Sequence, residues 1–143
     1  MLNSLLKLDG SLRDIYINNT SKKDWQLFLK FVQDHYSWTF FVDNIEEKRL
    51  PRFERLIELA EEKTLLFVVK LAPGFKIHCH FFCTQKEYSE IEMDFDPNEI
   101  VSQQELNLLI TFLKELSILL QKTINVCGEN TPENVLFAIY PSD

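Results

Sequence analysis

The sequence predicts a single α+β domain over residues 1–143, with helices packed on the apolar face of a mixed or antiparallel sheet. Two segments, 22–36 and 103–122, repeat apolar residues at helical spacing. Between them, residues 65–96 read as three consecutive strands, a central meander. No internal repeat or linker-like stretch divides the chain, and 143 residues suffice for one core.

The first half of the chain alternates strands and helices. Residues 12–18 are expected to form a strand, and a helix over 22–36 follows, preceded by a capping box of Ser21 and Asp24. Residues 38–43 are aromatic and β-branched and predict a second strand. A polar turn over 44–49 then leads to a helix that has Pro51 in its first turn and ends near residue 62.

The meander comprises strands over 65–71, 75–83 and 90–96, and one register fits all three. Pairing Leu71 with Phe75, and Cys83 with Ser89, makes one face wholly apolar. That face contains Leu65, Phe67, Val69, Leu71, Phe75, Ile77, Cys79, Phe81, Ile91, Met93 and Phe95. A slip of one residue would mix the two faces, which burial penalises strongly.

The opposite face of the meander is then polar. Cross-strand neighbours on it pair opposite charges: Lys76 with Asp96, His78 with Asp94, and His80 with Glu92. Each such pair contributes about 0.2–1 kcal/mol, so the pattern supports the register.

The last third begins with a capping box of Ser102 and Glu105 and a long helix over 103–122. Its leucine-rich stripe is broad enough to indicate burial on more than one side, or contact with another chain. A short strand over 123–127, a loop over 128–134 and a final strand over 135–140 are expected to follow.

Charge and cysteine content limit the function classes. The net charge of −7 lies entirely in residues 73–143, which favours a basic protein partner or a cation over nucleic acid or an anionic membrane surface. No apolar run approaches the roughly 18–20 residues of a membrane span. Three cysteines, with no signal-peptide pattern, predict a cytoplasmic protein with reduced thiols.

Two groups of residues are candidates for a site. His78 and His80 point the same way from one strand toward Asp94 and Glu92, which fits a divalent metal or acid–base chemistry, or simply hydrogen bonds on a polar sheet face. The acidic cluster fits a docking surface for a basic partner, or simply a solvated strand face; it comprises Glu87, Glu90, Glu92, Asp94, Asp96 and Glu99.

The sequence contains no motif for a cysteine metal site, a phosphate-binding loop or a serine nucleophile. Cys79 and Cys83 are about 13 Å apart along a strand, too far to share an ion without a bulge, and are interpreted as buried small hydrophobes. With only three glycines, no phosphate-binding loop can be written, and no G-x-S-x-G nucleophile motif occurs. No cofactor is therefore predicted.

Three stretches together resemble a family of small, mostly uncharacterised bacterial α+β proteins: SLRDIYI with NNTSKKDW (11–25), HCHFF (78–82) and EIEMDFDPNEI (90–100). Some members of that group are immunity proteins in toxin–antitoxin-like competition systems. The resemblance implies a bacterial source and binding rather than catalysis, and it assigns no residue a role.

Three functional hypotheses follow. The first is a non-catalytic binding protein, an immunity protein that neutralises a basic toxin through Glu90, Glu92, Asp94 and Asp96. The second is a metal-binding protein or hydrolase that uses His78 and His80 with a carboxylate, with Asp94 as the third metal ligand. The third is a structural subunit of a homo-oligomer that associates through the 103–122 helix.

Overall fold

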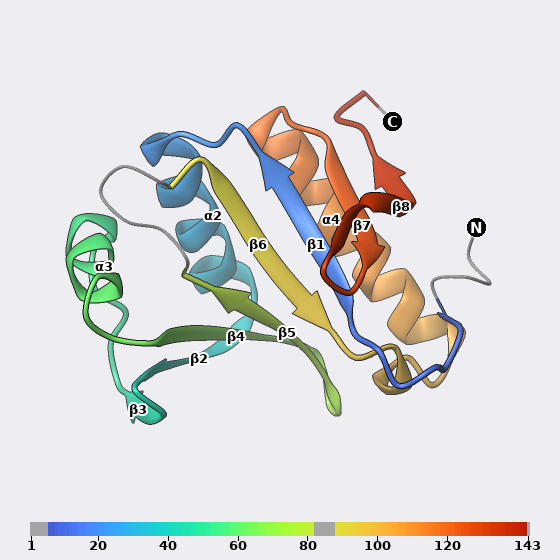
Figure 1. The fold of residues 1–143 in the computed structure, drawn as a ribbon, viewed down its shortest axis with the longest axis horizontal. Helices are drawn as coiled ribbons and strands as arrows, with labels where there is room; N and C mark the ends of the chain where they lie inside the picture. The colour runs from blue at the N-terminus through green and yellow to red at the C-terminus, as the bar shows by residue number, and fades with distance from the viewer. Residues whose placement is uncertain (1–5, 82–87, 143) are drawn as a thin grey trace.

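The computed structural model describes residues 6–81 and 88–142, which form an α+β fold with an eight-stranded sheet (Figure 1). Helices α2 (Lys22–His35) and α4 (Gln103–Leu120) lie on one side of the sheet, and α3 (Phe53–Ala60) lies beside α2. The strands are β1 (Arg13–Asn18), β2 (Ser37–Val42), β3 (Ile45–Glu47), β4 (Leu65–Ala72), β5 (Phe75–His80), β6 (Glu90–Phe95), β7 (Ile124–Gly128) and β8 (Thr131–Ile139).

All strand pairs of the sheet are antiparallel, in the order β3-β2-β4-β5-β6-β1-β7-β8. The predicted meander β4-β5-β6 therefore lies at the centre. The N-terminal strand β1 is inserted between β6 and β7, which the sequence did not predict. This insertion joins the two halves of the chain into one sheet.

The predicted register is confirmed through the middle of the meander. Phe67 pairs with Cys79, and Cys79 pairs in turn with Met93. The predicted pairing of Leu71 with Phe75 is wrong, because Phe75 pairs with Ala72 and the register shifts between Lys70 and Ala72. The tight turn at Gly74, where φ is +84°, takes up the shift, and Leu71 is only half-buried. The predicted pairing of Cys83 lies outside the described residues.

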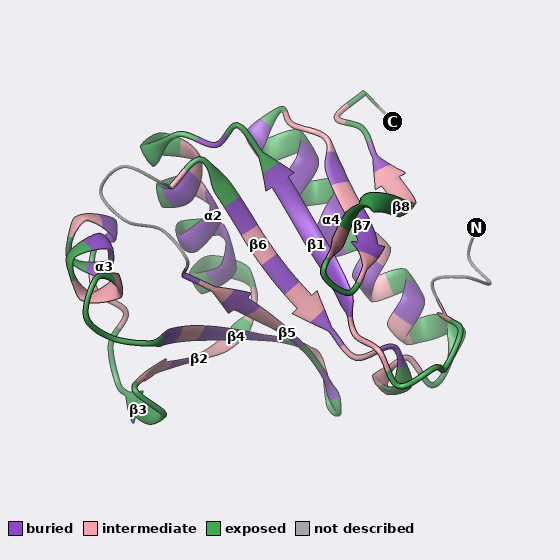
Figure 2. Cartoon of the chain, viewed as in Figure 1, coloured by how far each residue is buried: buried purple, intermediate pink, exposed green. Residues whose placement is uncertain are grey.

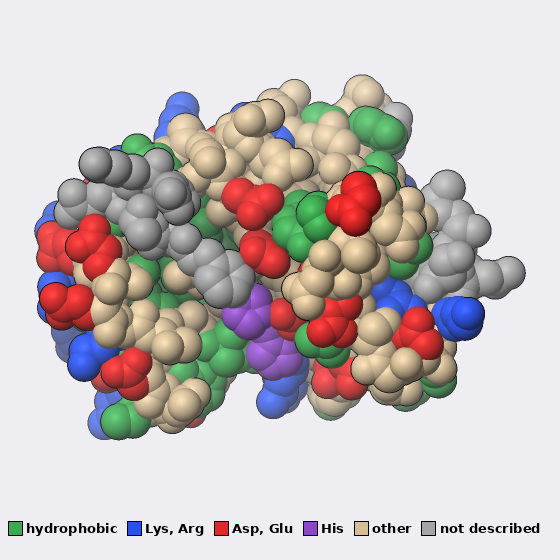
Figure 3. All heavy atoms as spheres, in the orientation of Figure 1, with side chains coloured by type: hydrophobic (Ala, Val, Ile, Leu, Met, Phe, Trp, Pro, Cys, Tyr) green, Lys and Arg blue, Asp and Glu red, His purple; other side chains and the backbone are tan. Residues whose placement is uncertain are grey.

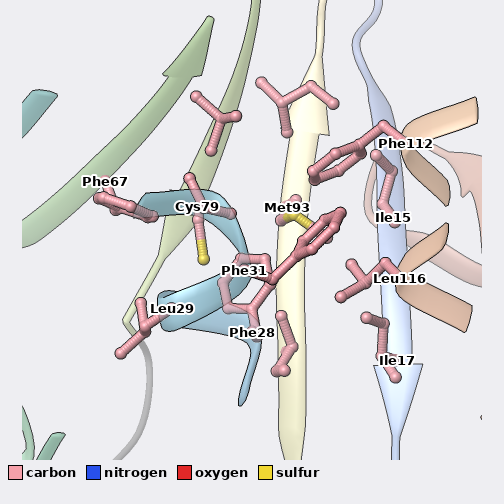
Figure 4. Close-up of a cluster of buried hydrophobic side chains, with 14 of the residues drawn as sticks. Ile15, Ile17, Phe28, Leu29, Phe31, Phe67, Cys79, Met93, Phe112 and Leu116 are labelled. Carbon is pink, nitrogen blue, oxygen red and sulfur yellow. The ribbon is translucent and has the colours of Figure 1, made fainter. Parts of the chain in front are cut away.

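The core lies between the sheet and the two long helices. Figure 4 shows side chains of β4, β5, β6 and β1 pointing toward those of α2 and α4. Along β6, burial alternates with a period of two, as Figure 2 shows, so one side of the strand faces the core. Fully buried members include Ile15, Phe28, Phe67, Met93 and Phe112.

The helix ends follow their capping residues. Both bonds of the Ser21–Asp24 capping box are present: Asp24 N donates to Ser21 Oγ over 3.2 Å, and Ser21 N donates to Asp24 Oδ2 over 2.8 Å. The predicted box at Ser102 is only partly correct. Ser102 Oγ accepts from the backbone N–H of Gln104, and not from that of Glu105, while the Ser102 hydroxyl donates to Glu105 Oε1.

Two predicted loops contain strand, and one predicted helix is shorter. Residues 44–49 include β3, because Asp43 and Asn44 both adopt positive φ and close a two-residue hairpin. β8 begins at Thr131, inside the predicted 128–134 loop. Helix α3 ends at Ala60, not near residue 62, and Pro51 precedes its N-cap residue Arg52.

The broad apolar stripe of α4 is only partly covered. Its inner positions are buried, whereas Ile118 and Leu119 are 54% and 38% exposed. Within residues 6–81 and 88–142, no helix has both the length and the apolar character needed to cross a membrane.

Candidate functional site

The face of the sheet opposite α2 and α4, here called the open face, bears the polar residues that the sequence singled out. Figure 3 views this face and shows histidine side chains over β5 beside acidic side chains. Glu90, Glu92 and Asp94 reach it from β6, and His78 and His80 reach it from β5. Cross-strand pairs His78–Asp94 and His80–Glu92 match the predicted register.

Asp94 is paired with the two histidines. Its Oδ2 forms a short hydrogen bond with His80 Nε2, and its Oδ1 lies 3.7 Å from His78 Nδ1. The Asp94 side chain is only 16% exposed. The bond to Asp94 raises the pKa of His80 above its usual value, against the opposing effect of burial. Asp94 and His80 thus behave as a charge-assisted pair within the open face.

A second polar cluster on this face comes from β1. Asp14 is 5% exposed, and its Oδ2 accepts from the Asn130 backbone N–H over 2.7 Å and from the Tyr16 hydroxyl over 3.1 Å. Burial raises the pKa of Tyr16, and the neighbouring Asp14 carboxylate adds to the effect. This cluster fixes the turn between β7 and β8 against β1.

Sequence reasoning missed Asp14 and Tyr16 as members of the open face. Side chains of the segment RDIYIN alternate between the two faces of the sheet. Ile15 and Ile17 are buried on the helix side, and Asp14 and Tyr16 point away from the helices. The sequence did not indicate which strands lie beside β1. Asp14 lies opposite Asp94 of β6 and Cys127 of β7 only because β1 is inserted between these strands.

The four predicted contact residues, here called the acidic strip (Glu90, Glu92, Asp94 and Asp96), differ in their surroundings. Asp96 caps the short 3₁₀ helix Pro97–Glu99 by accepting from Asn98 N over 2.9 Å. Asp94 is occupied by the histidines, as described above. Glu90 and Glu92 have no ion pair with any described residue. Burial raises the pKa of both, and the pKa of Glu92 is raised further by repulsion from Glu90 and Asp14, while the neighbouring His80 acts in the opposite direction.

The proposed metal ligands His78, His80 and Asp94 do come together. Nevertheless, no group of three or more His, Cys, Asp or Glu residues among the described parts of the chain is arranged to hold a metal ion. His80 Nε2 and Asp94 Oδ2 are hydrogen-bonded to each other, so a metal ion would have to displace that hydrogen bond. The metal hypothesis stays an untested prediction.

The cysteines are separated by the sheet. Cys79 is buried on the helix side of β5, and Cys127 is buried on β7, where its Sγ lies 3.5 Å from the Pro132 carbonyl. The burial of Cys79 fits its interpretation as a small buried hydrophobe, while Cys83 lies outside the described part. Burial raises the pKa of the Cys127 thiol, and repulsion from Asp14 and Glu133 acts in the same direction.

Comparisons with known proteins identify no family. No protein-family model and no curated protein matches the chain. Among solved structures, it is similar to the Pseudomonas aeruginosa T6SS protein PA0821, with a TM-score of 0.35 and 13% sequence identity. The match covers 82% of this chain and 40% of that protein, so the chain spans less than half of its length. A likeness at this level carries no conclusion about function.

Proposed function

We propose that this chain is a non-catalytic binding protein that contacts a basic protein partner through the acidic strip, in the manner of an immunity protein. The observation that supports the proposal is the state of Glu90 and Glu92. Their pKa values are raised by burial and, at Glu92, by repulsion from other carboxylates that outweighs the attraction of His80, and neither forms an ion pair with Lys or Arg among the described residues. A Lys or Arg from a partner would relieve that repulsion.

The distribution of charge supports the same direction. The net charge is −7, and Asp14 adds a further carboxylate beside the acidic strip. Such a surface steers a basic partner to the open face and accelerates association at low salt. Lys70 and Lys76, on β4 and β5, are exposed and border the strip on one side, so the partner's contact is centred on β6 and β1.

A site-specific crosslink tests the location of the contact. A photoreactive p-benzoylphenylalanine replaces Glu90 in one variant and Glu115, an exposed residue on α4, in the other. We expect a discrete adduct with a basic protein from position 90 after irradiation in the host cell, and none from position 115. Adducts from position 115 alone would move the interface to the helix layer and overturn the proposal.

Charge removal then tests the mechanism on the purified adduct partner. The Glu90→Gln/Glu92→Gln variant is compared with Glu62→Gln/Glu115→Gln, which loses the same two charges from exposed positions away from the open face. Each contact is of the order of 1 kcal/mol, so the first variant, which loses two, should bind about 30-fold more weakly, with a shallower salt dependence. Equal affinities for the two variants would contradict a contact through the acidic strip.

A further inference from the structure

The two edges of the sheet differ in a way that indicates how a partner could attach. β3, at one edge, has three residues, two of which are Glu46 and Glu47. β8, at the other edge, has nine residues, and no charged side chain occurs from Asn134 to Tyr140. Short length and charges are the usual protection of an edge against further pairing. β3 has this protection, and the second half of β8 lacks it.

The second half of β8 is also the regular half. Phe137, Ala138 and Ile139 pair in sequence with Val126, Asn125 and Ile124 of β7, whereas the register shifts lie closer to the turn. Pro132 lies in that irregular first half. β7 is the only described strand that pairs with β8, so the other backbone edge of 137–139 has no strand partner in the described chain.

Side chains along this edge are partly apolar and accessible. Val135 is 47% exposed, and Tyr140, directly after the strand, is 52% exposed. An added strand would pair its backbone with β8 and contact these side chains, which together provide both affinity and register.

Charge indicates whether a second copy of the chain or a basic segment would pair with the β8 edge. Glu133 of β8 is exposed, and Asp14 of β1 lies opposite Cys127 of β7, so both carboxylates lie within two strands of the β8 edge. Pairing β8 with β8 of a second copy would bring together two chains of net charge −7 and join their open faces. A basic segment is attracted by the same charges.

We propose that β8 accepts an extended, basic segment of the protein partner as an additional antiparallel or parallel strand beside residues 135–139. The inference rests on the proposed function, because it gives the partner that is expected on β6 and β1 a second contact, at the sheet edge two strands from β1. The segment alternates Lys or Arg with β-branched residues, so that one side faces the acidic residues and the other faces the helix layer.

A model peptide tests this recognition mode without the natural partner. The probe is an acetylated, amidated peptide of four Lys-Val repeats, and the control is the same peptide with every backbone amide N-methylated. Both carry the same charge, but the control cannot donate to a neighbouring strand. We expect the probe to bind at least about 10-fold more tightly in low salt, and to slow hydrogen exchange of amides in 135–139.

Edge variants locate the contact on the chain. Val135→Lys places a charge on the β8 edge, and Ile45→Lys places the same charge on β3, where Ile45 is 68% exposed. The first should weaken binding of the probe about 10-fold, and the second should leave it within about twofold. Unchanged thermal unfolding of both variants shows that each has folded.

The outcomes separate this inference from the proposed function. Equal binding of the two peptides, without exchange protection in 135–139, overturns strand addition and leaves attraction by charge alone. A dimer of the chain by sedimentation at micromolar concentration, with 135–139 already protected, also overturns it in favour of a second copy. The proposed function fails instead when the Glu90→Gln/Glu92→Gln variant binds the crosslinked partner unchanged.

Discussion

The same strands form both faces of the sheet, but helices cover one face and no helix of the described chain covers the other. Along β6, Ile91, Met93 and Phe95 are fully buried against the helix layer. The intervening Glu90, Glu92 and Asp94 point to the open face, where no helix of the described chain covers them. The apolar side chains of the core face are buried by the rest of the chain, whereas the open face bears the carboxylates of Glu90 and Glu92, whose pKa values are raised. The comparison indicates that stability resides on one face and that recognition is expected on the other.

The largest contrast is expected between neighbouring residues of β6. Met93→Ala removes a fully buried side chain and should lower the free energy of unfolding by about 2–5 kcal/mol. Glu92→Gln should change it by less than about 0.5 kcal/mol, and toward greater stability, because repulsion with Glu90 and Asp14 is removed. Urea denaturation at pH 7 measures both. A larger loss for Glu92→Gln than for Met93→Ala would break the distinction between the faces.

A smaller effect is expected at Asp14, a buried carboxylate on the open face that also accepts from the β7–β8 turn. Asp14→Ala leaves the Asn130 N–H and the Tyr16 hydroxyl without their acceptor, which should cost about 1–3 kcal/mol by the same measurement. The matched control is Asp34→Ala on α2, where a surface pair with Lys30 is lost, and the cost should stay below about 0.5 kcal/mol. Similar losses in both variants would contradict a structural role for Asp14.

The smallest effect is a dependence of stability on pH. The pKa of His80 is raised in the folded state, so its stabilising contribution is complete below about pH 6.5, its unfolded value, and is lost as the pH rises through the folded value. The raised pKa values of Glu90 and Glu92 act in the same direction at lower pH. We therefore expect the free energy of unfolding to fall as the pH rises above about 6.5.

One titrating group limits this fall to less than about 1.4 kcal/mol per pH unit. His80→Gln should flatten the curve in that range. Denaturation series at several pH values provide the measurement. A stability that rises with pH in both wild type and His80→Gln would show that the pair with Asp94 does not control the profile.

Local patterns predicted the meander and both long helices because each depends on nearby residues. Alternation over 65–96 determines which side chains are buried, and the Ser21–Asp24 box and the Ser102 cap determine where helices begin. The histidine–carboxylate contacts were predictable for the same reason, since β5 and β6 are consecutive.

Long-range placement could not be predicted from these patterns. β1 lies between β6 and β7, so Asp14 joins the acidic strip from a position about 80 residues away in sequence. Its alternation indicated two faces but not which strands would be its neighbours. The β2–β3 hairpin was missed for a different reason: its turn consists of Asp43 and Asn44, which adopt the positive φ that glycine adopts in more familiar hairpins.

The positions of two cysteines provide natural chemical reporters for the two sides of the sheet. Cys79 is enclosed on the helix side, while Cys127 is enclosed where the β7–β8 turn packs over β1, and β6 and β1 lie between their strands. With Cys83 replaced by Ser, the alkylation rate of each thiol would measure how often its own surroundings open. Separation of the two layers would expose Cys79, and detachment of the C-terminal hairpin would expose Cys127, so one labelling experiment could distinguish the two motions without any added probe.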